Sequence, residues 1–398
     1  MSHRRKHPTY TSMYKKILLG FYAKKRLETT LLPYPSCKVG DDVSDIETPA
    51  LVLDLDAFDR NLRQLNAHAK GLRVRPHAKS HKCPAIAHRQ ISLGAVGICC
   101  QKLSEAIVFA QAGIKDILLT NQVVGTAKLA RLAELAQTIR LGVLVEDPQN
   151  LRALAKAMAD KAQPLDVYVE VEVGGQRCGV TPVKAVALAQ QIRASNGLRF
   201  AGLHCYHGPA QHFRQGDQRQ SAIDGAANIA GHTVELLAQR GIATPCVTGA
   251  GTGTFWLERD SGVYTELQPG SYAFMDRDYA DNQAAATDVR FEHSLFIQTT
   301  VMSVSHQDFV VVDAGLKSMS VDSGMPRVHG IPTLAYVRAS DEHGVIDTTH
   351  GPDVALGDTL RLIPGHCDPT FNLYDELVVV SNNKVVDIWS IAARGASL

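Results

Sequence analysis

Short apolar runs alternate with longer amphipathic segments from residue 48 to about residue 287, which predicts a parallel α/β fold. The first run, 48–55, precedes a segment, 56–72, in which apolar Phe58, Leu62 and Leu65 recur every three or four residues, as on one face of a helix. The later strands are predicted at 72–78, 95–100, 116–120, 139–146, 165–171, 198–207, 245–251 and 264–267, and the later helices at 84–93, 102–113, 125–137, 148–162, 182–195 and 218–240.

The number of strand–helix units distinguishes between parallel folds. Eight units in roughly 220 residues favour a TIM-type (β/α)8 barrel, with an open doubly wound sheet as the structural alternative. After about residue 288 the chain shows strand-like runs separated by turns, without long helical patterns. This change predicts a smaller β domain at the C-terminal end of the chain.

Composition excludes several classes of protein. A chain that is 45% hydrophobic and 20% charged can bury a large core and is not intrinsically disordered. No apolar run approaches the roughly 20 residues of a membrane span. The eight cysteines form no C-x-x-C pair, so we expect free thiols in a reducing, cytoplasmic compartment.

The formal net charge of +1 conceals an asymmetry along the chain. Residues 1–27 carry eight basic residues and no acidic one, which leaves 33 of the 41 basic residues against 40 acidic ones. An acidic body argues against nucleic acid as a partner. We interpret residues 1–47 as a basic leader; a disordered extension, an over-long start and an organellar transit peptide all stay open.

A basic segment, RPHAKSHK, ends the first predicted barrel strand and contains Lys79 and Lys82. Active residues of such barrels lie at the C-terminal ends of the strands. A lysine that is desolvated there becomes a usable amine nucleophile. The alternative interpretation is a solvated basic turn.

The segment TGAGTGTF, residues 248–255, follows another predicted strand. Its glycines let backbone N–H groups approach an anion closely, and its threonines add hydroxyl donors. The spacing matches neither the P-loop nor the dinucleotide fingerprint, which argues against ATP and NAD. The segment therefore indicates either a phosphate cup or an ordinary glycine-rich turn.

Three more side chains with useful chemistry follow predicted strands. Arg177 can make bidentate contacts to an oxyanion. Tyr206 offers a stacking face or a proton, and His207 offers a base near neutral pH. The alternatives are a surface arginine and a half-buried aromatic ring beside a solvated histidine.

His366 and Asp368 lie two residues apart between strands of the predicted β domain. In an extended segment, both side chains project to one side and Cys367 projects to the other. One imidazole and one carboxylate, without a third protein ligand nearby, suit an open Mn²⁺ or Mg²⁺ site better than structural zinc. An exposed turn is the alternative.

Nine motifs occur in one order between Thr48 and Gly395, and together they resemble the D-threonine aldolase family. They read TPALVLDL, RPHAKSHK, GICCQKLSEA, VEVGGQRCGV, YHG, TGAGTGTF, YTELQPGSYAFMD, DAGLKS and HCDPTFNLYDELVVV. The same superfamily includes D-serine dehydratases and D-3-hydroxyaspartate dehydratases. The resemblance implies the alanine racemase fold, with a pyridoxal-phosphate barrel at 56–287 and a β domain formed by 48–55 with 288–398.

The resemblance also implies roles for individual residues. Lys79 would bind the cofactor covalently, while Arg177 would face its phenolate oxygen. Tyr206 would lie beside the ring, Tyr272 would meet its pyridine side, and Gln101 would complete the pocket. The phosphate cup would comprise Thr248, Gly249, Gly251, Thr252, Gly253 and Thr254.

In the same way, His207 would be the base, and His366 and Asp368 would bind the divalent metal. The implied activity is retro-aldol cleavage of a small β-hydroxy-D-amino acid to glycine and an aldehyde. The D-serine dehydratase relatives use a softer His-x-Cys pair, so His-x-Asp favours the aldolase. A D-serine or D-3-hydroxyaspartate dehydratase, a non-catalytic cofactor-binding protein and assembly as a homodimer stay open.

Overall fold

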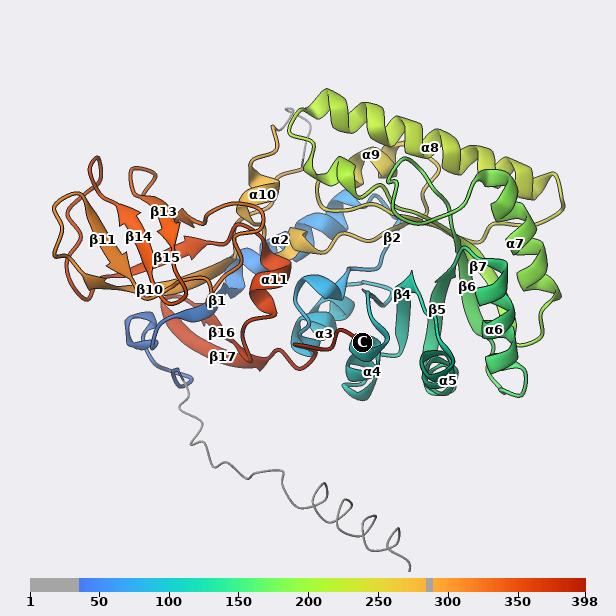
Figure 1. The fold of residues 1–398 in the computed structure, drawn as a ribbon, viewed down its shortest axis with the longest axis horizontal. Helices are drawn as coiled ribbons and strands as arrows, with labels where there is room; N and C mark the ends of the chain where they lie inside the picture. Colours follow the sequence, from blue (N-terminus) through green and yellow to red (C-terminus); the bar gives the residue numbers. More distant parts are fainter. Residues whose placement is uncertain (1–35, 284–288) are drawn as a thin grey trace, which may run out of the picture.

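The computed structural model describes residues 36–283 and 289–398, which form a barrel beside a β domain (Figure 1). The barrel strands are β2 (Arg73–Val74), β3 (Ile98–Cys100), β4 (Asp116–Gln122), β5 (Arg140–Val145), β6 (Leu165–Glu170), β7 (Leu198–Cys205), β8 (Val247–Gly249) and β9 (Glu266–Leu267). Within the described ranges they form one eight-stranded sheet in the order β2-β9-β8-β7-β6-β5-β4-β3. Every neighbouring pair is parallel.

The two end strands of this sheet meet, and their contact closes the barrel. The Val96 N–H donates to the Val74 carbonyl at 2.9 Å, and the Cys99 N–H donates to the Pro76 carbonyl at 2.8 Å. His77 and Cys99 form a parallel bridge in the same place. The TIM-type barrel is therefore confirmed, and the open doubly wound sheet is wrong.

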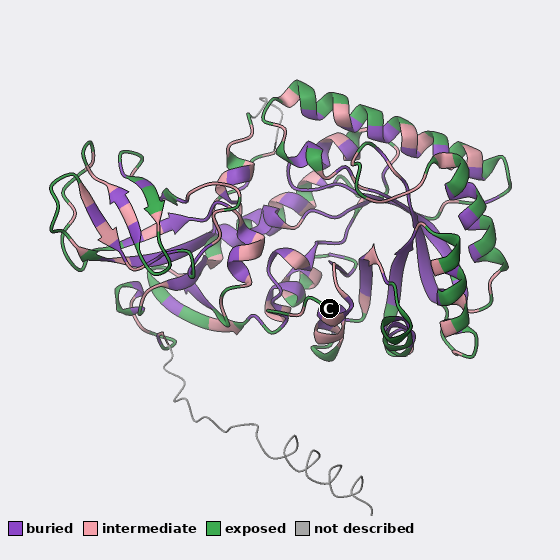
Figure 2. Cartoon of the chain, viewed as in Figure 1, coloured by how far each residue is buried: buried purple, intermediate pink, exposed green. Residues whose placement is uncertain are grey.

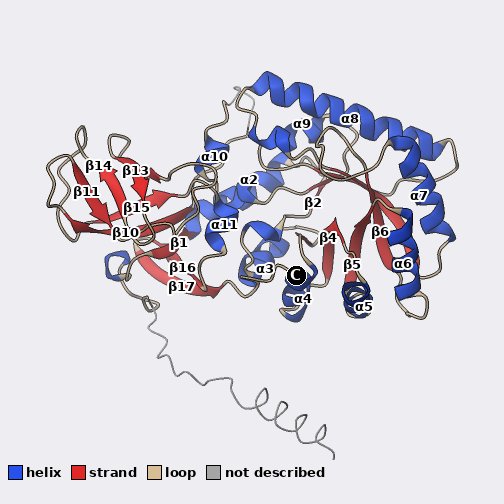
Figure 3. Cartoon of the chain, in the orientation of Figure 1, coloured by secondary structure: helices blue, strands red, loops and turns tan. Residues whose placement is uncertain are grey.

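Helices cover the outside of the barrel in the predicted alternation (Figure 3). They are α3 (Pro84–Ser92), α4 (Leu103–Gln111), α5 (Thr126–Leu135), α6 (Pro148–Met158), α7 (Pro182–Ala194) and α8 (Gly216–Ala238), followed by the short α9 (Phe255–Asp260). The buried side chains of α6, Leu151, Leu154 and Met158, lie three or four residues apart and so share one face. Among the described helices, none combines the length and apolar character that a membrane crossing requires.

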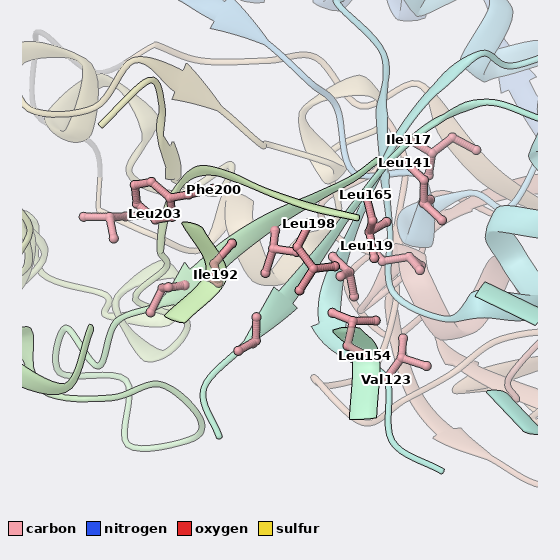
Figure 4. Packing of buried hydrophobic residues seen from close by; sticks show 14 of the residues in the cluster. Ile117, Leu119, Val123, Leu141, Leu154, Leu165, Ile192, Leu198, Phe200 and Leu203 are labelled. Carbon is pink, nitrogen blue, oxygen red and sulfur yellow. The ribbon is translucent and has the colours of Figure 1, made fainter. Parts of the chain in front are cut away.

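The barrel core fills the space between the strands and these helices. Figure 4 shows Leu154 of α6 packed near Leu119 and Leu165 of the sheet, all of them buried. Figure 2 shows the resulting layers: the strands are buried, and the outer faces of the helices are exposed. Such packing makes the sheet a rigid base for the loops at its rim.

The β domain is built on a second sheet that includes the first strand of the chain. Its strands are β1 (Ala50–Asp54), β10 (Leu295–Ser303), β11 (Phe309–Val312), β12 (Arg327–Val328), β13 (Ala335–Ala339), β14 (Gly344–Asp347), β15 (Thr359–Ile363), β16 (Glu376–Ser381) and β17 (Lys384–Ser390). β1 pairs antiparallel with β10 and parallel with β16. From β1 onward, the chain therefore leaves this sheet for the barrel and then returns to it.

Part of the predicted leader packs against the second sheet. Residues 36–47 include the 3-10 turn η1 (Val43–Asp45), and Cys37, Val43 and Ile46 are buried against the sheet. The Gly40 N–H donates to the Val385 carbonyl at 2.8 Å. Residues 1–35, which hold the basic part of the leader, lie outside the described residues.

Helix α2 (Leu55–His68) joins the two parts of the molecule. It begins directly after β1 and buries Phe58, Leu62 and Leu65, as the sequence predicts. The Phe58 ring stacks on Phe274 with centroids 5.9 Å apart and meets Trp389 of β17 edge-on at 6.4 Å. Phe58 thus contacts both a strand of the β domain and the segment that follows the barrel.

Replacing Phe58 with alanine should lower the free energy of unfolding by about 3–5 kcal/mol, because it leaves a cavity where α2 joins the two parts. The measurement is urea unfolding followed by circular dichroism. Val183 on α7 is 72% exposed, and Val183→Ala should change stability by less than about 0.5 kcal/mol. Equal midpoints for the two variants would show that Phe58 does not hold this junction together.

Candidate active site

A cavity of about 430 Å³ opens at the C-terminal ends of the barrel strands. Side chains and backbone from several strand ends converge on it, as the parallel sheet requires. The predicted site residues that line it are Lys79, Gln101, Arg177, Tyr206, Gly251 and Thr252. These residues follow five different strands, so the cavity collects most of the chemistry that the sequence indicates.

Lys79 lies in the 3-10 turn η2 (Ala78–Ser80), directly after the first barrel strand. The turn is capped by His77, whose Nδ1 accepts the Lys79 N–H at 3.3 Å. The Lys79 Nζ forms an ion pair with Asp368. Desolvation favours the neutral amine, but the Asp368 charge outweighs it and raises the pKa of Lys79.

Lys82 faces away from the cavity. Its Nζ lies 3.1 Å from Glu105 Oε1, and both side chains are largely buried. The basic segment is therefore not a solvated turn: one lysine pairs in the core, and the other lines the cavity.

Arg177 lies in the loop after β6 and reaches the cavity beside Tyr206. The Arg177 Cζ is 5.7 Å from the centroid of the Tyr206 ring, and its Nη2 is 4.0 Å from Glu170 Oε1. Burial raises the pKa of the Tyr206 phenol, which keeps it protonated. Gln101 donates its Nε2–H to the Thr120 carbonyl at 3.3 Å, which fixes the amide at the cavity wall.

Two carboxylates and a thiol lie close together beside the Arg177 loop. Atoms that could bind a metal ion lie within 4.8 Å of one another in Glu146, Glu170 and Cys178. The Glu146 carboxylate accepts the Gly179 N–H, and the Glu170 carboxylate accepts a bond from a glutamine amide. The Glu146 carboxylate therefore supports the loop that carries Arg177, whereas Glu170 lines the cavity and is bonded by Gln122.

The glycine-rich loop after β8 presents Gly251 and Thr252 to the cavity. Their backbone N–H groups donate no hydrogen bond to any residue that the structure describes. A Cβ on Gly251 would lie 2.5 Å from Gln211 Oε1, so a side chain there would displace Gln211. Two free N–H groups on a close-fitting loop suit the phosphate of a bound cofactor.

The rest of this motif lies behind the cavity wall. The four residues of the predicted cup that do not line the cavity are Thr248, Gly249, Gly253 and Thr254. The Thr248 hydroxyl donates to Glu266 at 3.0 Å, and the Thr254 hydroxyl donates to Glu258 at 2.8 Å. Their side chains support the loop from below and do not face the cavity.

Tyr272 also lies away from the cavity lining. Its hydroxyl accepts the Gln90 Nε2–H at 3.2 Å, and its ring meets Phe291 edge-on at a centroid distance of 5.6 Å. Its backbone N–H donates to Thr252 Oγ1 at 3.0 Å. The residue contributes to the site through this backbone bond, and its ring packs in the core.

Two histidines follow β7, and the structure places the second one at the cavity. His207 is absent from the lining; its Nδ1 accepts the Ala210 N–H at 3.1 Å, and desolvation lowers its pKa. His212 lines the cavity, with its Nδ1 2.5 Å from Asp278 Oδ2. Sequence analysis missed His212, although a second histidine in the segment YHGPAQH is a signal that could have identified it.

The Asp278 carboxylate that holds His212 is itself strongly stabilised as the anion. Burial alone would raise its pKa, but hydrogen bonds from His212 and Arg214 lower the pKa to about 2. Asp278 belongs to the short helix α10 (Arg277–Ala280), which follows the barrel. The pair therefore consists of a fixed anion and an imidazole at the cavity edge.

His366 and Asp368 converge, with His366 Nε2 3.9 Å from Asp368 Oδ1. The prediction of an extended segment is wrong, because helix α11 (Cys367–Phe371) begins immediately after His366. His366 is the extended N-cap of this helix, and Cys367 is fully buried behind it. Burial would raise the pKa of Asp368, but Lys79 and His366 lower it to about 2.

The pKa of Glu258 can be used to test whether its side chain is buried beneath the glycine-rich loop. Its side chain is buried under the loop, and desolvation raises its pKa from 4.5 to about 7. The folded protein therefore keeps this proton up to about pH 7, whereas the unfolded chain releases it near pH 4.5. Because the folded state binds more protons in this window, the contribution of Glu258 to stability falls as pH rises from 4.5 to 7.

Glu258→Gln removes this titration and keeps the shape of the side chain. Between pH 4.5 and pH 7, wild type should lose up to about 3 kcal/mol of unfolding free energy relative to the variant. Urea unfolding of both proteins at pH 5, 6 and 7.5 measures the difference. A difference that stays constant with pH would exclude the raised pKa.

Comparison with known proteins identifies the family. The alanine racemase N-terminal domain family matches residues 53–278, and a serine dehydratase domain family matches residues 294–380. D-threonine aldolase from Arthrobacter sp. is 50% identical over 91% of this chain and 97% of its own length. 3-hydroxy-D-aspartate aldolase from Paracoccus denitrificans (strain Pd 1222) is 45% identical over 89% of this chain and 94% of its own length.

Solved structures agree with this result. The crystal structure of D-threonine aldolase from Filomicrobium marinum has a TM-score of 0.88 and 46% identity, and the match covers 91% of this chain and all of that one. D-threo-3-hydroxyaspartate dehydratase from Delftia sp. HT23 has a TM-score of 0.77 at 25% identity, covering 88% and 98% of the two chains. The chain therefore belongs to the D-threonine aldolase family, whose barrel and β domain have the alanine racemase fold.

Proposed function

We propose that this protein is a lyase that cleaves β-hydroxy-D-amino acids such as D-threonine to glycine and an aldehyde, with pyridoxal phosphate and a divalent metal. One observation carries the proposal: the cavity brings Lys79, a phosphate-type loop and the His212–Asp278 pair together beside His366 and Asp368. The relatives named as aldolases are 45–50% identical, whereas the Delftia dehydratase is 26% identical, which favours carbon–carbon cleavage over dehydration.

The cavity residues fit the cofactor of this family. Lys79 would supply the amine that holds it, and the free N–H groups of Gly251 and Thr252 would bind its phosphate. Arg177 would meet the phenolate oxygen of the cofactor from the loop after β6, and the Tyr206 ring, whose centroid lies 5.7 Å from the Arg177 Cζ, would lie beside the cofactor ring. When bound, pyridoxal phosphate supplies an electron sink for the pair left on Cα as the Cα–Cβ bond breaks.

His212 is the base that takes the proton of the β-hydroxyl. Its Nδ1–H donates to Asp278, so the lone pair of the neutral ring is on Nε2. Asp278 also stabilises the imidazolium that forms when Nε2 accepts the proton. In His207, Nδ1 accepts a backbone N–H, so its neutral ring carries the proton on Nε2 and offers no lone pair at the cavity.

His366 and Asp368 are the divalent-metal ligands. Their separation of 3.9 Å lets His366 Nε2 and Asp368 Oδ1 share one ion, and the Lys79 ammonium already shows that this carboxylate attracts a cation. With two protein ligands, a bound ion would have open positions for water and for the substrate hydroxyl. A nitrogen and a hard oxygen ligand suit Mn²⁺ or Mg²⁺, and either ion would lower the pKa of a hydroxyl that it binds.

The reaction products test the proposed function. Purified protein with pyridoxal phosphate and Mn²⁺ should convert D-threonine to equal amounts of acetaldehyde and glycine, measured by a coupled dehydrogenase assay and by chromatography. EDTA should reduce the rate at least tenfold, and Lys79→Ala should abolish turnover because no amine holds the cofactor. Keto acid and ammonia from D-serine or D-3-hydroxyaspartate, without any aldehyde, would identify a dehydratase instead.

The choice of base has its own test, because both histidines can be replaced in the same way. His212→Asn should lower kcat about 10²- to 10⁴-fold, since proton transfer loses its acceptor. His207→Asn should stay within about tenfold of wild type, since that side chain does not reach the cavity. Cofactor absorbance of both variants checks that the site stays loaded. A larger loss in His207→Asn than in His212→Asn would reverse the assignment.

A further inference from the structure

We infer that Asp322 is a positioning residue that orients His366 for the divalent metal, an inference that rests on the metal pair of the proposed function. Asp322 lies in the loop between β11 and β12, far in sequence from its partner. Its Oδ2 is 2.9 Å from His366 Nδ1. The contact joins two segments of the β domain directly beside the cavity.

The two nitrogens of the His366 ring face different partners. Nδ1 meets the Asp322 carboxylate, while Nε2 lies 3.9 Å from Asp368 Oδ1. A carboxylate only accepts hydrogen bonds, so Nδ1 carries the proton and the lone pair is on Nε2. Asp322 thereby fixes both the tautomer and the direction in which the ring presents its lone pair.

Asp322 is itself held in place by its own loop. The Ser320 hydroxyl donates to Asp322 Oδ1 at 2.6 Å, and the Ser323 hydroxyl donates to Oδ2 at 3.3 Å. The same loop is fastened to α11, because the Ser320 N–H donates to Thr370 Oγ1 at 3.2 Å and the Thr370 hydroxyl donates to the His366 carbonyl at 2.8 Å. The loop and the metal ligand are thus one connected unit.

The backbone of the Asp322 loop also packs closely against the backbone that precedes His366. A Cβ on Gly365 would lie 2.1 Å from the Gly324 carbonyl oxygen, which is closer than any side chain allows. Gly365 directly precedes His366, and only a glycine at this position lets the loop that carries Asp322 and Gly324 pack so closely against it. The close packing of these two segments therefore places Asp322 beside His366 and limits how far the two side chains can move apart.

Asp322 acts through His366, and it is not a third ligand of the same ion. It occupies the ring edge opposite to the one that faces Asp368, and its side chain is 50% exposed. A carboxylate that accepts the distal N–H also increases the basicity of the ligating nitrogen. Loss of such a partner typically weakens metal affinity about 10- to 100-fold.

The test measures Mn²⁺ affinity rather than turnover. The enzyme loaded with pyridoxal phosphate is titrated with Mn²⁺, and free Mn²⁺ is read from its electron paramagnetic resonance signal. Asp322→Ala should weaken the affinity about 10- to 100-fold, and Asp322→Asn should weaken it less, because its amide oxygen still accepts the Nδ1–H. The cofactor absorbance and affinity should match wild type in both variants.

Asp387→Asn is the matched control. Asp387 is an exposed carboxylate of the same domain, and its Oδ2 accepts an aromatic N–H from Trp389 at 2.8 Å. This variant removes the same charge from a similar hydrogen bond, and Mn²⁺ affinity should stay within about twofold of wild type.

Two outcomes separate this inference from the proposed function. If His366→Ala binds Mn²⁺ as tightly as wild type, the metal pair is wrong and the proposed function fails in that part. If His366→Ala loses tight binding while both Asp322 variants keep wild-type affinity, the metal pair stands and the role of Asp322 is wrong. A loss of cofactor affinity equal to the loss of Mn²⁺ affinity would likewise overturn positioning, because it would show general disruption.

Discussion

One buried carboxylate, Asp276, determines where the barrel and the β domain meet at the cavity. It accepts the Tyr279 N–H at the start of α10 and the Cys367 N–H at the start of α11, each at 3.0 Å. Desolvation raises the pKa of Asp276 to about 6, although the two backbone hydrogen bonds favour the carboxylate and act in the opposite direction. Because α10 carries Asp278 and α11 carries Asp368, a single side chain fixes both the support of the proposed base and one of the two proposed metal ligands.

The residues of the site are held in place in two different ways. The barrel rim supplies the groups that are proposed to hold the cofactor, and each group needs only its own strand to be placed. The proposed base and the proposed metal ligand His366 instead need contacts between distant segments: His212 with Asp278, and His366 with Asp322. The first set depends on one sheet, whereas the second set depends on contacts between segments that lie far apart in the sequence.

That division also explains which parts of the site could be predicted from the sequence. Lys79 and Arg177 each follow a strand, and a parallel barrel brings all strand ends to one rim, so local pattern was enough for these two residues. Gln101 was predicted only from the family resemblance. His212 depends on Asp278, 66 residues further on, and no local pattern encodes that contact. Helix α11 has five residues, too few to show a helical period, so the segment was predicted as extended. The fold was predictable because eight repeated units give a strong periodic signal.

The position of β1 has a consequence for the order in which the protein matures during synthesis. β1 ends at Asp54, and its partners β10 and β16 begin only at Leu295 and Glu376. A ribosome that adds about 5–20 residues per second makes β1 at least roughly ten seconds before either partner. All the barrel strands emerge in that interval, so the barrel can assemble while an apolar strand still lacks neighbours. The proposed metal ligands His366 and Asp368 are made last among the site residues, so the complete site can form only after nearly the whole chain has been made.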